Sequence, residues 1–311
     1  MTLRIVLVFA ALLLHFSPAI RLATAEGATQ SVRADVQIEM RNVRLHVDAG
    51  IVLWVTRLRG VMVSRTAGAP PVFDDQRSYV LKLQAAELSI DMASLQNLMN
   101  RHVFGYEGSP LTDVSVEVDG ARLKMKGKMH KGIVVPFSTT TSVSTTPEGA
   151  MRLHVESMKA LGIPAKGLLG AFGLTLDDVV SVKNRRGVDI QDNDIVIAAG
   201  QVLPPPQIEG HLTRAIVQGG RLVQTFGDPA KQASLVKPSR AARNYIYFGG
   251  GTITFGKLTM RDADLQLIDA DSRDPFDFFP ARYDAQLVAG YSKNTPSKGL
   301  RTYMPDFDDL K

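Results

Sequence analysis

Short segments in which hydrophobic and polar residues alternate follow one another along most of the chain. In residues 33–47 the hydrophobic residues occupy every second position, and the phase of this alternation changes between Met40 and Val43. A period of two is typical of a β-strand with one buried face. The change of phase predicts a β-bulge inside this strand.

The same pattern predicts strands along the rest of the chain. Asp119-Gly120 is a typical hairpin turn between two of them. Gly249-Gly250-Gly251 is interpreted as a hairpin or a bulge, residues 227–243 as a loop or short helix, and residues 292–311 as loosely structured. The further strands are expected at 51–64, 78–92, 112–118, 121–129, 133–143, 187–199, 207–218, 221–226, 244–248, 251–260 and 262–270.

Two segments have helical spacing instead. Residues 93–103 place hydrophobic side chains about 3.6 residues apart, and Asp91 or Ser94 is suited to cap the first turn. The second helix is expected after Pro164, in an apolar stretch that contains Gly167, Gly170 and Gly173. Each glycine costs a helix about 1 kcal/mol relative to alanine, so these three favour close packing or a mobile element. The fold class is therefore α+β and dominated by strands.

The first 25 residues have the features of a secretory signal peptide. Arg4 precedes the apolar run of residues 5–14, Pro18 breaks the helix, and Ala23-Thr24-Ala25 supplies small residues for the peptidase. We expect cleavage after Ala25 and a periplasmic location, and no later apolar stretch is long enough to span a bilayer. The expected organisation is a signal peptide at 1–25, an α/β half at 26–200 and a β-rich extension at 201–311, which either continues the same sheet or forms a second domain.

Composition limits the classes of function. The chain has no cysteine, which excludes disulfides, thiolate metal sites and a cysteine nucleophile. Of 36 basic residues two lie in the signal peptide, so the remainder carries 34 basic and 31 acidic residues, a net charge of +3. This charge is too small to predict nucleic-acid binding. It suits transient contact with an anionic membrane surface and equally suits solubility, which we favour.

The order of features in residues 121–176 resembles a known family. A strand containing Gly127 leads to GIVVPFS, then to PEGAMRLHV and to LGIPAKGLLGAFG. This order is similar to that of a bacterial family of exported lipid-binding proteins (LmeA-like), whose mycobacterial member is linked to mannan elongation. It is more distantly similar to the tubular lipid-binding superfamily (TULIP-like), which includes bactericidal permeability-increasing protein. The resemblance implies a long, strongly curved antiparallel sheet wrapped around one or two helices, with acyl chains held inside.

A lipid carrier needs an apolar, concave interior, and soft methionine side chains suit its walls. Each candidate is also consistent with an ordinary core residue, because apolar residues at regular spacing usually pack against one another. The candidate lipid-binding residues are Leu98, Met99, Val103, Met125, Val135, Phe137, Leu161, Ile163, Leu168, Leu169 and Phe172.

No pattern of catalytic, cofactor-binding or metal-ligating residues stands out. The histidines lack the spacing of a metal site, and no serine lies in a nucleophile elbow. The aspartates of residues 262–277 are interpreted as turn formers, and 269–277 is the segment where a cation would be sought. Phe276, Phe278 and Phe279 are expected to anchor the C-terminal segment to the sheet, or else to contact a membrane or partner.

Three functions remain in order of preference. The first is non-catalytic binding of lipid or another apolar ligand. The second is an envelope scaffold that binds a partner and no ligand. The third is a hydrolase of envelope lipid or glycan, which requires a localised polar cluster in a cleft.

Expression with export in a bacterial host tests the signal-peptide prediction. We expect the exported protein to begin at Glu26, because signal peptidase cuts after small residues such as those at Ala23 and Ala25. Intact-mass measurement checks this. An exported protein that retains residues 1–25 would contradict it.

Overall fold

Strands account for most of the secondary structure in the computed structural model. It describes residues 35–131, 133–160, 163–164, 187–236 and 242–310. Of the described residues, 58% lie in strands and 13% in helices. The strands form two large sheets, neither of which is closed. The sequence-based prediction of a β-dominated fold is therefore confirmed.

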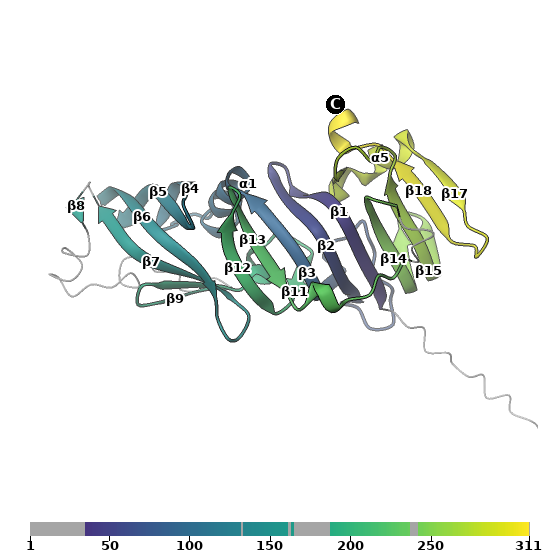
Figure 1. The fold of residues 1–311 in the computed structure, drawn as a ribbon, viewed down its shortest axis with the longest axis horizontal. Helices are drawn as coiled ribbons and strands as arrows, with labels where there is room; N and C mark the ends of the chain where they lie inside the picture. The colour runs from purple at the N-terminus through teal and green to yellow at the C-terminus, as the bar shows by residue number, and fades with distance from the viewer. Residues whose placement is uncertain (1–34, 132, 161–162, 165–186, 237–241, 311) are drawn as a thin grey trace, which may run out of the picture. The chain divides into compact units, whose positions relative to one another are not determined.

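The larger sheet contains eleven strands and draws on both ends of the described chain (Figure 1). Its main order is β12-β13-β3-β2-β1-β14-β15-β18-β17. Most neighbours are antiparallel, whereas β15–β18, β1–β16 and β3–β11 are parallel pairs. The strands are β1 (Val36–Asp48), β2 (Ile51–Ser64), β3 (Tyr79–Asp91), β11 (Gln207–Glu209), β12 (Leu212–Gln218), β13 (Arg221–Phe226), β14 (Tyr245–Phe255), β15 (Leu258–Asp269), β16 (Phe276–Phe278), β17 (Tyr291–Asn294) and β18 (Leu300–Met304).

The second sheet contains seven strands in the order β4-β5-β6-β7-β10-β9, with β8 paired to β7. The α-helix α1 (Met92–Leu98) and the π-helix η1 (Met99–Val103) connect β3 to this sheet. The segment α4 (Ala199–Val202) leads back to the larger sheet. The strands are β4 (Leu111–Asp119), β5 (Arg122–Lys131), β6 (Ile133–Thr145), β7 (Met151–Ala160), β8 (Ile163–Pro164), β9 (Val188–Gln191) and β10 (Asp194–Ile197).

Several local predictions match the structure. Asp91 caps α1 by accepting a hydrogen bond from the Ser94 amide at 2.7 Å. Gly120 has a φ of 64° in the turn between β4 and β5, as a hairpin glycine should. The β-bulge expected between Met40 and Val43 is not found, because the register of β1 with β2 is continuous there and shifts only between His46 and Asp48. The change of phase falls at Asn42, whose φ is 50°. The side-chain amide of Asn42 donates a hydrogen bond to the side-chain oxygen of Asn244 at 2.7 Å, so this polar group has a partner at the irregular position.

Other local predictions are corrected. Gly249–Gly251 lie inside β14 and the hairpin turn is at Gly256-Lys257, so the hairpin interpretation of the three glycines is wrong, and the strand expected at 251–260 crosses this turn. The bulge interpretation is also wrong, because the register of β14 with β15 is unbroken across the glycines. The strand expected at 207–218 is divided, because β11 pairs directly with β3 whereas β12 pairs with β13. The expected loose structure of residues 292–311 is also wrong, since this segment holds most of β17, all of β18 and a 3-10 turn at Phe307–Leu310.

Residues from both sheets form one hydrophobic core. Leu53 and Ile90 of the larger sheet and Leu123 and Leu153 of the smaller sheet belong to the same buried cluster. Each open sheet has one apolar face, and burying these faces is the main favourable contribution to folding. The position of this shared core determines where an internal cavity can form.

The C-terminal aromatic residues are anchored to the sheet. Phe276 and Phe278 are buried in β16, which pairs in parallel with β1. The alternative of a membrane-facing or partner-facing row is therefore wrong for these two residues. They bury large apolar areas and hold the last thirty-odd residues against the first strand.

Replacement of Phe276 tests this anchoring. Because Phe276 has no exposed surface, we expect Phe276→Ala to lower the free energy of unfolding by about 3–5 kcal/mol. Phe279→Ala, at a half-buried neighbour, serves as the control and should cost less. Urea unfolding measures both, and equal small losses would contradict the anchoring.

Candidate functional site

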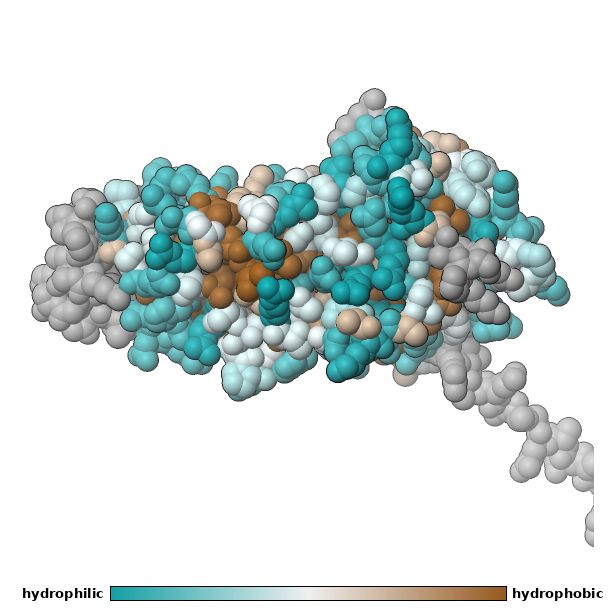
Figure 2. Space-filling view, viewed as in Figure 1, coloured by the Kyte–Doolittle hydropathy of each residue, from teal (hydrophilic) through white to brown (hydrophobic). Residues whose placement is uncertain are grey.

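An apolar cavity, named here the α1 cavity, lies where the two sheets meet. It is bounded by side chains from α1, η1, both sheets and α4, and its volume is about 60 Å³. Figure 2 shows hydrophobic side chains reaching the surface around α1, β12 and β13. The lining residues are Leu53, Leu88, Ile90, Leu95, Leu98, Met99, Val103, Val116, Leu123, Met125, Met151, Leu153, Ile197, Gly200, Val202, Leu203, Ile208, Leu222, Gln224 and Phe226.

Hydrogen bonds to both sheets fix the helical side of this cavity. The Ser94 hydroxyl of α1 accepts a hydrogen bond from the Val52 amide of β2 at 3.1 Å. In η1, the Asn100 side chain accepts from the Val114 amide at 2.9 Å and donates to the Val114 carbonyl at 2.6 Å. These contacts place the apolar side of the helices, with Leu98 and Met99, between the sheets.

The chemistry of the cavity is almost entirely apolar. Among the described lining residues Gln224 alone carries a polar side chain. Such a wall has no group that donates or accepts a proton at a bound molecule, and it favours hydrocarbon over water. Three of the lining residues are methionines, whose unbranched thioethers adapt to ligands of different shape.

The structure brings four of the predicted lipid-binding residues together. Leu98, Met99, Val103 and Met125 all line the α1 cavity. Phe137 is buried outside the cavity, and Val135 is half-buried against the core. Leu161, Leu168, Leu169 and Phe172 lie outside the described residues, and of Ile163 only the backbone is described.

Many lining residues were not predicted from the sequence. Leu53, Leu88 and Ile90 alternate along strands, and this alternation identifies a buried face without identifying which part of it borders a void. Leu203 and Ile208 flank a run of three prolines, which indicates a loop. Only the tertiary structure brings this segment to the cavity.

A second apolar pocket lies on the other side of the proline segment. Its volume is also about 60 Å³, and Leu203 and Ile208 line both this pocket and the α1 cavity. We call it the β1 pocket. Its other walls include Ile38, Met40 and Phe248 from the larger sheet.

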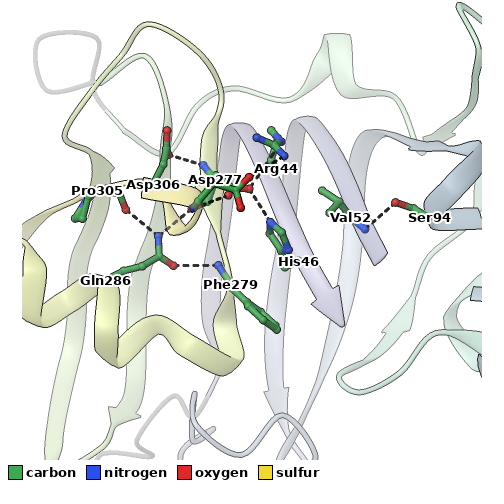
Figure 3. A network of polar contacts seen from close by, with 10 residues as sticks. Arg44, His46, Val52, Ser94, Asp277, Phe279, Gln286, Pro305 and Asp306 are labelled. Carbon is green, nitrogen blue, oxygen red and sulfur yellow. Dashed lines mark hydrogen bonds and ion pairs between the residues drawn. The ribbon is translucent and has the colours of Figure 1, made fainter. Parts of the chain in front are cut away.

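A buried polar network holds the C-terminal segment beside the β1 pocket (Figure 3). The carboxylate oxygen Oδ1 of Asp277 lies 2.7 Å from Nε2 of His46 and 3.8 Å from Nε of Arg44. The Asp277 amide donates to the Asp306 carboxylate at 2.7 Å. The Gln286 side chain donates to the Asp277 and Pro305 carbonyls at 2.9 Å each. The network joins β1, β16, α5 (Tyr283–Ala289) and the C-terminus, which is a structural role.

The pKa of Asp306 is strongly shifted. Burial raises the pKa of its carboxyl from 3.8 to about 7, and the nearby carboxylates of Asp269, Asp274 and Asp277 act in the same direction. The hydrogen bond from the Asp277 amide acts in the opposite direction and is outweighed. Asp306 therefore takes up a proton on folding below about neutral pH.

The remaining charged groups show no sign of a metal centre. Among the described residues, no three His, Asp or Glu side chains form a group that could hold a metal ion, and this includes the described aspartates of 269–277. Three of the described histidines have individual partners instead: His102 contacts Asp48, His154 contacts Asp194 and His130 contacts Thr112.

No protein-family model, curated protein or solved structure matches the chain. The resemblance to lipid-binding families therefore stays a prediction from the sequence of residues 121–176. None of the described helices is long and apolar enough to cross a membrane.

Asp306→Asn tests the origin of the shifted pKa. Above pH 3.8 the unfolded carboxyl loses its proton while the folded one keeps it up to about pH 7, so the wild-type protein loses stability over this range. The side-chain amide of asparagine does not ionise, so the Asp306→Asn variant avoids this loss of stability. At pH 8 we expect Asp306→Asn to be more stable by at least about 1 kcal/mol, since one pKa unit is worth about 1.4 kcal/mol.

Thermal unfolding at pH 4 and pH 8 measures the difference, which should nearly vanish at pH 4. Asp262→Asn, at an exposed position with a φ of 49° that asparagine tolerates, is the control. An equal effect of the two substitutions at pH 8 would contradict the assignment to Asp306.

Proposed function

We propose that this protein binds lipid or another apolar ligand in the α1 cavity, without catalysis. The observation that carries the proposal is the composition of the cavity wall, which is hydrocarbon from two sheets and three helical segments with one polar side chain among the described residues. An ordinary core at this junction would be filled. The described side chains at this junction leave a void of about 60 Å³.

The size of the cavity determines how a ligand is accommodated. A void of about 60 Å³ exceeds the roughly 10–15 Å³ that one water needs and is smaller than the roughly 150 Å³ that holds benzene. An acyl chain must therefore displace wall side chains. Met99, Met125 and Met151 are suited to this, because their rotamers change without moving the backbone.

We propose that this binding takes place in the bacterial envelope, which the resemblance and the signal-peptide pattern support. In this proposal the two sheets curl around α1 and η1, as the sheets of tubular lipid-binding proteins curl around their helices. The hydrogen bonds from α1 to β2 and from η1 to β4 support that arrangement. Removal of residues 1–25 leaves a periplasmic protein that holds an apolar ligand away from water.

A partner-binding scaffold is the second candidate, and one exposed surface favours it. On α5 and β17, Leu287, Val288 and Tyr291 are 41%, 86% and 52% exposed. The strand β17 is also an edge of the larger sheet. Exposed apolar side chains beside a free edge are common features of protein interfaces.

Mass spectrometry of bound lipid tests the proposed function. We expect residues 26–311, exported by a bacterial host and purified without detergent, to retain a stoichiometric phospholipid or fatty acid. Met125→Trp puts a larger side chain into the cavity, and we expect it to weaken lipid binding about tenfold, or about 1.4 kcal/mol.

Met129→Trp is the matched control, because Met129 is buried on the same strand and does not line the α1 cavity. Both variants need a cooperative unfolding transition to show that they fold. A wild-type protein that emerges empty and takes up no added fatty acid would contradict the proposal and favour the scaffold.

A further inference from the structure

The two apolar pockets border the same polar cleft. A polar cleft of about 660 Å³ lies against the segment from α4 to β11. It shares Gly200 and Leu203 with the α1 cavity, and it shares Leu203 and Pro205 with the β1 pocket. Leu203 thus borders all three spaces.

The charge of the cleft is positive. Its lining contains Arg65 and Arg77 together with glutamines, and no acidic residue. Arg65 donates a hydrogen bond to the Gln207 side chain at 2.5 Å. Asp75 accepts a hydrogen bond from the backbone amide of Arg77 at 3.0 Å. Within the part of the chain that the structure describes, neither guanidinium forms an ion pair.

We infer that the ligand is a two-chain lipid with an anionic headgroup. Its headgroup binds Arg65 and Arg77 in the polar cleft, and its two chains diverge into the α1 cavity and the β1 pocket. A planar guanidinium binds phosphate or carboxylate oxygens with two parallel hydrogen bonds, so two arginines suit one anionic group. This inference rests on the proposed function and adds the class of ligand.

The proline segment explains how two small pockets admit long chains. A Cβ built on Gly200 would lie 1.5 Å from the Ile208 carbonyl oxygen, so α4 packs directly on the start of β11. The segment between them folds back on itself and carries Leu203 and Ile208, the residues that separate the pockets. In this inference the segment moves as one unit and enlarges both pockets together.

Uptake of lipid from vesicles tests the inference. Residues 26–311 are incubated with vesicles of phosphatidylcholine alone or of phosphatidylcholine with phosphatidylglycerol, separated from them, and assayed for bound lipid by mass spectrometry. We expect wild type to take up one phosphatidylglycerol per chain, with a preference of about tenfold over phosphatidylcholine. The double variant Arg65→Gln, Arg77→Gln should lose this preference and keep the uptake of phosphatidylcholine.

The matched control is Arg214→Gln, Arg261→Gln, which removes the same charge from exposed strand positions outside the cleft. It should retain the preference. Uptake of both lipids without preference overturns the inference and leaves the proposed function standing, whereas uptake of neither overturns both.

Two further outcomes separate a lipid headgroup from other anions. Inorganic phosphate alone should compete weakly, since it has no chains. Phosphate that competes as strongly as the vesicle lipid would overturn the assignment to a lipid.

The number of chains is tested by the stoichiometry. Two single-chain lipids bound per protein, in place of one two-chain lipid, would overturn the two-chain assignment.

Discussion

Burial of the apolar faces of two open sheets against each other is the interaction on which the rest of this structure depends. A single buried cluster includes residues of both sheets and of the helical segment between them. Because α1 and η1 are hydrogen-bonded to β2 and β4, they occupy the junction and keep the facing strands apart. The α1 cavity is the consequence, since the side chains at this junction do not fill the space between the sheets.

Two polar anchors hold other segments in place around this core. Glu39 of β1 is buried, and it accepts hydrogen bonds from Tyr245 at 2.7 Å, Ser234 at 2.8 Å and the Leu235 amide at 2.5 Å. Burial acts to raise the pKa of Glu39, but these bonds outweigh it and the pKa lies below its ordinary value. The Asp277 network holds the C-terminal segment in the same way. Both anchors act on β1, the strand at the centre of the larger sheet.

The sequence predicts local features of this fold well and distant ones poorly. Strand alternation, the Asp91 cap and the Asp119-Gly120 turn depend on neighbouring residues, so their patterns are visible in the chain. The pairing of β1 with β14 joins residues about two hundred positions apart, and no local pattern encodes it. The parallel pairing of β16 with β1 is equally distant, so the sequence indicated that the aromatic residues anchor to the sheet but not the strand with which they pair.

The candidate site shows the same division. Helical spacing identified Leu98, Met99 and Val103, and strand alternation identified Met125, all of which line the α1 cavity. Phe137 has the same pattern but is buried elsewhere: a Cβ built on Gly127 would lie 2.9 Å from its ring, so the two residues are in close contact. The proline segment and the arginines of the cleft were missed, since loop residues carry no periodicity from which burial can be predicted.

Photo-crosslinking with a fatty acid that carries a diazirine on its acyl chain tests the central claim most directly. After irradiation of the folded protein, the labelled residues are located by peptide mass spectrometry. We expect the labels to concentrate on the walls of the α1 cavity, on α1, η1, β5 and β7. Labels confined to the exposed surface of α5 and β17, or an absence of saturable labelling, would contradict it.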